Sequence, residues 1–276
     1  MKPARFDYQQ AQNVAEISSA LMGDQAVKIL AGGQSLGPML NLRLLQPTLL
    51  VDITRVAELK QVNETHEDIL IGACVTHANI EDGCVPGATG RVLASIARGI
   101  AYRAVRNRGT LGGSLAHADP SADWISTLMA LDAELSVRKG TKVRQLRLLN
   151  SMSGPFDIGL EQGEWIEAVR IPIVSHESGW GYAKIVRKTG EFAHAMAAVL
   201  QDPARDCMRI VIGATETSPV VIEEKCPATS QLNLEDIKRK ALAQLEDAGV
   251  TDPIDNRVRL VAIERALNKS RYSSPL

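Results

Sequence analysis

The spacing of apolar residues along the chain predicts several helices. Near the N-terminus, apolar residues recur at helical spacing between residues 14 and 22. A longer stripe over residues 92–105 predicts one long, partly buried helix that ends near residues 107–109. A further helix is expected after Ser121, with its apolar positions at residues 125–133.

Two amphipathic helices are expected at the C-terminal end of the chain. The first has its apolar positions between Leu234 and Leu245, and Asn233 is its expected N-cap. The second has its apolar positions between residues 258 and 266, with Asp255 or Asn256 as the cap.

Short apolar runs of strand length alternate with these helices. From about residue 175 the pattern changes, and the runs 180–188 and 209–214 favour an antiparallel sheet. The stretch from Ile173 to Gly179 is therefore the candidate domain boundary. The runs before this boundary lie at residues 26–30, 49–53, 69–73, 134–138, 144–148 and 165–171.

Composition and charge narrow the classes of function. The 276 residues include 31 Lys and Arg against 32 Asp and Glu, which gives a formal net charge of −1. Nucleic acids and anionic membranes bind basic surfaces, so this balance argues against both as the main partner. No apolar run approaches the length of a membrane span, and the first residues form no secretory signal, so we expect a cytoplasmic protein.

The cysteines and histidines give no sign of a metal site. Cys74, Cys84, Cys207 and Cys226 are separated by 10, 123 and 19 residues, so none forms the close pair typical of zinc ribbons and iron–sulfur sites. We expect reduced thiols. The five histidines include no i, i+4 pair.

Two glycine pairs are the most informative feature of the sequence. Gly32-Gly33 follows a predicted strand, and Gly112-Gly113 lies between two predicted helices. Glycine allows positive φ and close backbone approach, and successive N–H groups in such a turn bind anions. With the hydroxyls of Ser35, Thr110 and Ser114, two such loops could clamp a dinucleotide. The alternative, that both are only tight turns, stays open, because neither matches the P-loop or the Rossmann glycine motif.

The sequences around both glycine pairs resemble a known family. Residues 31–36 (AGGQSL) and 38–43 (PMLNLR) are similar to the first FAD loop of the medium subunit of molybdenum hydroxylases, the carbon monoxide dehydrogenase and xanthine dehydrogenase relatives. Residues 106–120 (RNRGTLGGSLAHADP) resemble the second FAD loop. Thr76-His77 and residues 187–193 lie where the family has shorter motifs, so the resemblance covers essentially the whole chain.

The resemblance implies an α+β fold. Residues 1–174 would form a two-lobed FAD-binding domain of the vanillyl-alcohol-oxidase-like (PCMH) type, with lobes at about 1–57 and 58–174. Residues 175–276 would form a C-terminal α+β lobe with an antiparallel sheet. FAD would lie between the two lobes of the first domain.

The resemblance also implies a set of cofactor-binding residues. The first loop would embrace the FAD pyrophosphate through backbone N–H groups, and the second would form the opposite wall. Asp123 would contact the phosphate–ribose region; its alternative role is that of an acidic residue at a helix N-terminus. Lys184 would lie near the flavin ring; its alternative is a solvated lysine on the strand face that it shares with Trp180 and Tyr182. The full set is Ile29, Leu30, Ala31, Gly32, Gly33, Gln34, Ser35, Leu36, Ala101, Thr110, Gly112, Gly113, Ser114, Ala118, Asp123, Ile166 and Lys184.

Four residues in the motif positions have features that the resemblance does not explain. Ser114 stands where xanthine dehydrogenases often carry Asn, and Glu191 where many relatives carry Asp. His77 and His117 have two candidate roles, either hydrogen bonding to loop backbone or a redox or proton-transfer role. No catalytic residue is assigned.

The resemblance implies that the chain is the FAD-carrying electron-transfer subunit of a molybdenum-containing hydroxylase or dehydrogenase. A large partner subunit would hold the molybdenum cofactor and a small one two [2Fe-2S] clusters, usually in a dimer of heterotrimers. Electrons would pass from these clusters through FAD to an external acceptor, which the sequence does not identify. Two alternatives stay open: an autonomous FAD-dependent oxidoreductase of the same fold, and a flavin-free docking subunit.

Overall fold

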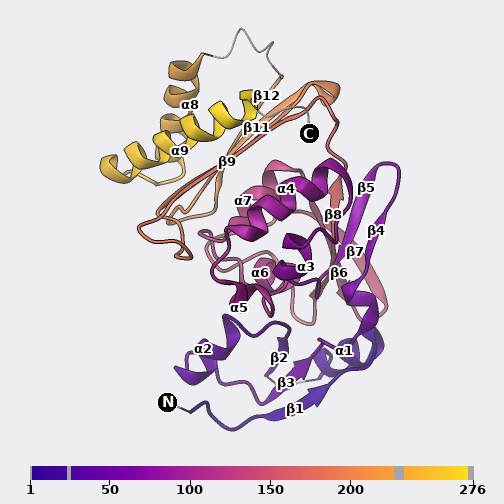
Figure 1. Cartoon of the computed structure of the whole chain (residues 1–276). Helices are drawn as coiled ribbons and strands as arrows, with labels where there is room; N and C mark the ends of the chain where they lie inside the picture. Colours follow the sequence, from indigo (N-terminus) through magenta and orange to yellow (C-terminus); the bar gives the residue numbers. More distant parts are fainter. Residues whose placement is uncertain (1, 24–25, 227–232, 273–276) are drawn as a thin grey trace.

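The computed structural model describes residues 2–23, 26–226 and 233–272. The strands of these residues form three sheets that follow one another along the chain. Figure 1 shows them stacked from the N-terminal lobe, in indigo, to the C-terminal lobe, in orange and yellow. No helix among the described residues is long and apolar enough to cross a membrane.

The N-terminal lobe is a small parallel sheet with order β1-β3-β2. Its core contains Ile17 and Val51, and Cys74 and Trp165 from later in the chain complete it. The first lobe therefore does not close a core with its own residues alone. Its elements are β1 (Asp7–Gln10), α1 (Val14–Leu21), β2 (Val27–Leu30), α2 (Leu36–Asn41) and β3 (Leu49–Asp52), and the 3-10 helix η1 (Ala57–Lys60) follows them.

The second lobe is an antiparallel sheet with order β4-β5-β8-β6-β7. All of its α-helices lie between β5 and β6 in the chain, and four of the five contribute residues to one large core with the sheet. The strands are β4 (Val62–Glu64), β5 (Asp68–Gly72), β6 (Glu134–Lys139), β7 (Lys142–Arg147) and β8 (Trp165–Pro172). The helices are α3 (His77–Glu81), α4 (Gly87–Arg98), α5 (Arg103–Arg106), α6 (Leu111–His117), α7 (Asp123–Ala130) and the 3-10 helix η2 (Leu148–Asn150).

The C-terminal lobe is an antiparallel sheet, as the sequence predicted, and its strand order is β12-β11-β10-β9. Both faces of this sheet are buried. Ala197 and Val199 of β10 pack with the C-terminal helices, whereas Ala198 and Leu200 join the core of the second lobe. The elements are β9 (Gly179–Ile185), β10 (Ala195–Asp202), η3 (Pro203–Arg205), β11 (Cys207–Gly213), β12 (Val220–Glu224), α8 (Leu234–Asp247) and α9 (Pro253–Tyr272).

Two expectations from the sequence are wrong in detail. The single long helix is two helices, because the chain turns away from helical geometry at Ala101 (φ 41°), between α4 and α5. The last helix begins at Pro253, and its cap is Asp252 rather than Asp255 or Asn256. The carboxylate of Asp252 accepts hydrogen bonds from the backbone N–H groups of residues 254 and 255. Proline is favoured in the first turn because its missing N–H is not needed there.

Candidate cofactor-binding site

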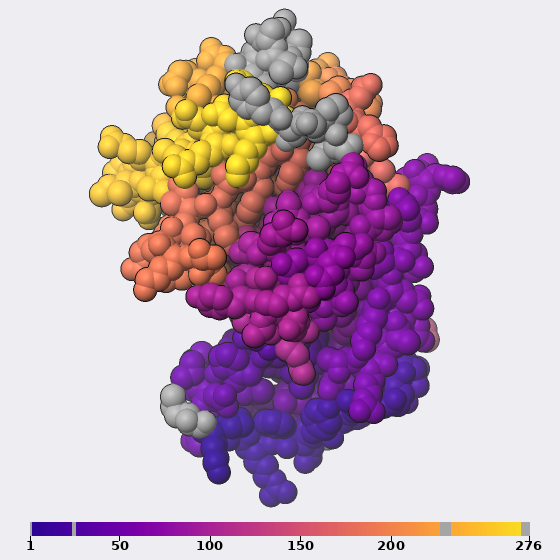
Figure 2. Space-filling model, viewed as in Figure 1, coloured from indigo at the N-terminus to yellow at the C-terminus, as the bar shows by residue number. Residues whose placement is uncertain are grey.

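The two glycine segments come from different lobes and lie against each other. A Cβ atom at Gly32 would lie 2.1 Å from the carbonyl oxygen of Arg108 and 2.8 Å from the Cα atom of Gly109. A Cβ atom at Gly113 would lie 3.8 Å from that of Ala31. The structure therefore brings together the two segments that the sequence predicted as one site. Figure 2 shows the molecular surface hollowed between the indigo N-terminal lobe and the segments above it.

The first segment offers backbone donors to a ligand. Ile29 and Leu30 end β2 and are half-buried, and Leu36 begins α2. Between them, Gly33 has φ +69°, which confirms that this position needs glycine. Among the hydrogen bonds of the described residues, none is donated by the N–H groups of residues 32–35. Four successive N–H groups thus have no acceptor among the described residues, and those of residues 33–35 belong to half-buried or exposed positions, as an anion-binding turn requires.

The second segment has a different geometry from the one expected. Gly112 and Gly113 lie in the first turn of α6, without positive φ, and Thr110 caps this helix. Their N–H groups already donate within the protein, Gly112 to the carbonyl oxygen of Ala73 (3.0 Å) and Gly113 to Oγ1 of Thr110 (3.1 Å). The second segment therefore differs from the anion-binding turn that the glycine pair suggested, because these two N–H groups are not free. Of residues 110–114, only the exposed Gly113 and the half-buried Ser114 are accessible to a ligand.

Close packing explains the first glycine of the second pair. A Cβ atom at Gly112 would lie 2.4 Å from that of Ala73, at the end of β5. The missing side chain lets α6 sit directly on the backbone that follows this strand. Glycine is a poor helix former, so its place in a first turn indicates that this close approach outweighs the propensity.

His77 is hydrogen-bonded to the residue that begins the second segment. Its backbone N–H donates to the carbonyl oxygen of Gly109 (2.9 Å), and its Nδ1 accepts a hydrogen bond from Nε1 of Trp124 (3.1 Å). Burial, helped by the charge of Arg106, lowers the pKa of His77 to about 4. The imidazole is therefore neutral near pH 7, which favours the backbone-supporting role. The ring of His117 lies 5.2 Å from that of Phe156, centroid to centroid.

Acidification from pH 6.5 to pH 4 is expected to destabilise the wild-type protein more than the variant His77→Gln. The unfolded chain protonates His77 near pH 6.5, whereas the folded chain keeps it neutral to about pH 4. Protons therefore favour the unfolded state across this range, and stability falls with pH by about 3 kcal/mol. Glutamine keeps an acceptor for Trp124 but does not titrate. Urea denaturation over this pH range measures the difference, and equal pH slopes would contradict the assignment.

Lys184 and Asp123 are joined to each other. The ammonium of Lys184 donates to both carboxylate oxygens of Asp123 (2.9 and 3.1 Å) and to the carbonyl oxygen of Gly99 (2.8 Å). The hydroxyl of Tyr182 donates to Oδ1 of Asp123 (2.7 Å). The Lys184 side chain is only 14% exposed, so it is not a solvated strand lysine. Asp123 is also the first residue of α7, which agrees with its alternative role.

The three remaining candidates have different surroundings. Ala101 has positive φ, and its carbonyl oxygen accepts a hydrogen bond from Nη1 of Arg106 (3.1 Å). Ala118 is fully buried and ends α6 in the left-handed conformation. Ile166 is buried in the core of the second lobe, and no contact described in the structure joins its side chain to the glycine segments.

Sequence analysis missed two residues that shape this region. Tyr182 was noted only as a neighbour of Lys184 on one strand face, and its contact with Asp123 spans 59 residues. Arg106 was noted only as part of a motif. It binds Glu81 (2.7 Å) and the carbonyl oxygens of residues 100 and 101. The alternation of β9 could have suggested Tyr182, because it puts residues 182 and 184 on the same side.

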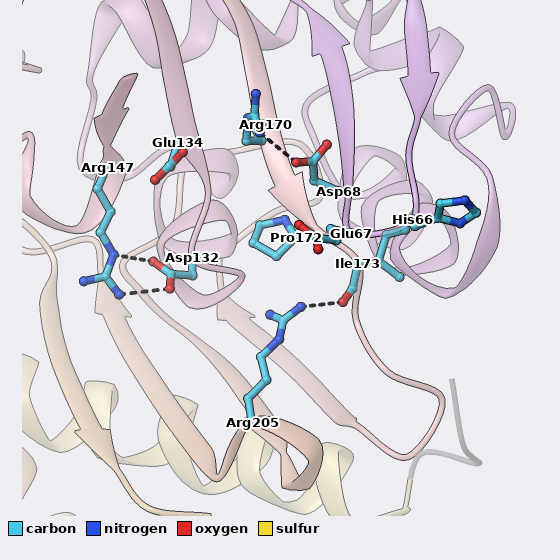
Figure 3. Close-up of a pocket in the computed structure, with 10 residues that line it drawn as sticks. All are labelled: His66, Glu67, Asp68, Asp132, Glu134, Arg147, Arg170, Pro172, Ile173 and Arg205. Carbon is cyan, nitrogen blue, oxygen red and sulfur yellow. Dashed lines mark hydrogen bonds and ion pairs between the residues drawn. The ribbon is translucent and has the colours of Figure 1, made fainter. Parts of the chain in front are cut away.

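The structure also contains a hollow of about 500 Å³ that is lined by charged side chains (Figure 3). Arg147 is paired with Asp132 (2.6 Å) and Arg170 with Asp68 (2.8 Å). None of the predicted cofactor residues lines it. This hollow is distinct from the site between the glycine segments.

The fold and the paired glycine segments define the class of this protein. Residues 4–174 match the family described as the FAD binding domain in molybdopterin dehydrogenase. The chain belongs to this family, so the resemblance found in the sequence, the α+β fold class and FAD as the cofactor are confirmed.

Several characterised relatives are similar over most of the chain. The 6-hydroxypseudooxynicotine dehydrogenase complex subunit alpha of Paenarthrobacter nicotinovorans is 38% identical over 79% of this chain and 76% of its own length. The carbon monoxide dehydrogenase medium chain of Hydrogenophaga pseudoflava is 33% identical over 82% of this chain and 79% of its own. Among solved structures, quinoline 2-oxidoreductase from Pseudomonas putida 86 matches with a TM-score of 0.84, 28% identity and full coverage of both chains.

Proposed function

We propose that this chain is the electron-transfer subunit of a molybdenum-containing oxidoreductase. It would take electrons from the [2Fe-2S] clusters of a small partner subunit and pass them through FAD to an external acceptor. A large partner subunit would hold the molybdenum cofactor and oxidise the substrate. Bound FAD supplies a redox group that accepts electrons singly or in pairs, and the protein binds, orients and tunes it.

The observation that carries this proposal is the contrast between the two glycine segments. The first segment offers the free N–H groups of residues 32–35. The second segment packs against the first, and the N–H groups of its two glycines already donate hydrogen bonds within the protein. The pyrophosphate of FAD would therefore bind to the first segment, because free backbone donors suit a diphosphate. The second segment would close the site sterically, with the hydroxyl of Ser114 as its contribution. Lys184 would lie at the flavin end.

The proposed partners follow from the names of the relatives. Two of them are called a complex subunit and a medium chain, which are parts of larger assemblies. For this chain we propose the same arrangement, as a dimer of heterotrimers with a large and a small subunit. The proposed division of the chain is an FAD-binding domain at 1–174, with lobes at about 1–57 and 58–174, and a C-terminal domain at 175–276.

A pull-down of the tagged chain from its native cells tests this function. Co-purification of a large and a small chain with flavin, iron and molybdenum is the expected result. A lone yellow chain without metals would favour the autonomous oxidoreductase, and a colourless complex would favour the docking subunit.

The variant Gly33→Val separates flavin binding from assembly. Valine opposes the φ of +69° at this position, so the variant is expected to bring down the partner chains without flavin. Gly23→Val is the matched control in the same lobe, because a Cβ atom there has its nearest neighbour at 3.9 Å and no positive φ is needed. Normal flavin content in Gly33→Val would contradict the proposed site.

A further inference from the structure

Four groups from three segments meet around one buried ion pair. Lys184 and Tyr182 come from β9, Asp123 begins α7, and the carbonyl group of Gly99 follows α4. The carboxylate of Asp123 accepts from both the ammonium and the phenol hydroxyl, while the ammonium also donates to Gly99. The side chains of Lys184 and Asp123 are 14% and 10% exposed.

These contacts fix the position of the ammonium. A lysine ammonium has three N–H donors, and the carbonyl oxygen of Gly99 and the two oxygens of Asp123 take up most of them. A lysine stem is otherwise flexible, so a carboxylate that is itself held in place is needed to orient it. Tyr182 holds that carboxylate. Burial and the charge of Asp123 raise the pKa of Tyr182 well above its usual value, so the phenol stays protonated and donates.

The ion pair is connected to the glycine segments through α5. Gly99 lies two residues before Ala101, whose carbonyl oxygen is held by Arg106. Arg106 lies two residues before Arg108, whose backbone carbonyl group packs against Gly32. The same stretch of chain therefore carries an acceptor for Lys184 at one end and the lobe-to-lobe contact at the other.

We propose that Asp123 and Tyr182 are positioning residues that hold the Lys184 ammonium at the flavin, with Tyr182 acting only through Asp123. This rests on the proposed function, because it takes Lys184 to lie beside the flavin. The ion pair as a whole carries no net charge, so its effect on the flavin depends on which end faces the ring. With the ammonium nearer, the cation stabilises the negative charge that the flavin gains on reduction.

The test is the midpoint potential of the flavin in the purified FAD-containing complex. Lys184→Met is expected to lower the potential, because it removes the cation and leaves the carboxylate. Asp123→Asn is expected to raise it, because the amide oxygen and the carbonyl oxygen of Gly99 can still hold the ammonium in place while the compensating negative charge is removed. Tyr182→Phe is expected to lower the potential by less than Lys184→Met does. It removes only a hydrogen bond that partly neutralises the negative charge of the Asp123 carboxylate. Shifts of the same sign for Lys184→Met and Asp123→Asn would overturn the proposal.

A double-mutant cycle tests whether Tyr182 acts through Asp123. In the Asp123→Asn background, Tyr182→Phe is expected to cause no further shift in potential, and a shift of undiminished size would overturn the proposal. Tyr8→Phe is the matched control, since its hydroxyl also donates to an aspartate, Asp52 (2.6 Å), but in the N-terminal lobe. Its potential is expected to equal that of the wild type.

The measurements can separate three outcomes: a variant that does not fold, a wrong proposed function and a wrong inference about Asp123 and Tyr182. Thermal unfolding and FAD content are measured for every variant. If Asp123→Asn does not fold, Lys184→Arg replaces it: a potential near that of the wild type supports the charge role, and one equal to that of Lys184→Met overturns it. A wild-type complex without FAD would instead refute the proposed function.

Discussion

Replacing Gly32 with alanine is expected to weaken FAD binding at least tenfold, which corresponds to about 1.4 kcal/mol. The added Cβ atom would lie 2.1 Å from the carbonyl oxygen and 2.7 Å from the carbonyl carbon of Arg108. Both are backbone atoms, so no side chain can rotate away, and the two glycine segments must separate. Titration of the FAD-free protein with FAD, followed by flavin fluorescence, measures the change.

Gly23→Ala is the control for this prediction. It makes the same substitution in the same lobe, where the nearest atom to the new Cβ would be 3.9 Å away. Its affinity for FAD is expected to match that of the wild type. If Gly32→Ala binds FAD as tightly as Gly23→Ala, the contact between the segments is not part of the site.

Arg106→Ala is expected to cost about 3 kcal/mol of unfolding free energy, because it breaks a buried ion pair by removing one partner. The side chains of Arg106 and Glu81 are 11% and 13% exposed. The substitution leaves the carboxylate of Glu81 and the carbonyl oxygens of residues 100 and 101 without this donor. It also frees the positive-φ turn at Ala101, so FAD affinity is expected to fall as well. Denaturant titration and FAD titration measure the two effects.

Arg103→Ala is the matched control, because Arg103 binds the same Glu81 from the surface with 46% of its side chain exposed. Surface pairs are worth about 1 kcal/mol or less, so this variant is expected to stay close to the wild type. Equal destabilisation by both variants would show that the buried position of Arg106 does not matter.

The sequence predicted the elements with strong periodicity and the motifs with fixed spacing. The parallel strands β2 and β3, the helix α7 and the antiparallel C-terminal sheet all lie where apolar runs placed them. The break between α4 and α5 was not predictable from periodicity. Apolar residues continue at helical spacing across it, while Arg106 captures the carbonyl groups that a continuous helix would have bonded.

The site was predicted in part. Residues 29–36 and 110–114 were brought together by motif resemblance, and the structure places them in contact. The different roles of the two glycine pairs could not be predicted from the sequence. A Gly-Gly pair is compatible both with a turn and with a helix that packs closely on a residue such as Ala73. The pairing of Asp123 with Lys184 joins residues 61 positions apart, and local patterns carry no information on such contacts.

The core of the N-terminal lobe has a consequence for synthesis of the chain. This core includes Trp165, which belongs to β8, between β5 and β6 in the second sheet. The first lobe therefore cannot close until the ribosome has released more than half of the protein. At about 5–20 residues per second, the roughly 110 residues between the end of the first lobe and Trp165 keep its apolar surface open for on the order of 5–20 s. During that time Ile17 and Val51 are exposed to chaperones and to aggregation, so slow translation before β8 would lengthen this exposure.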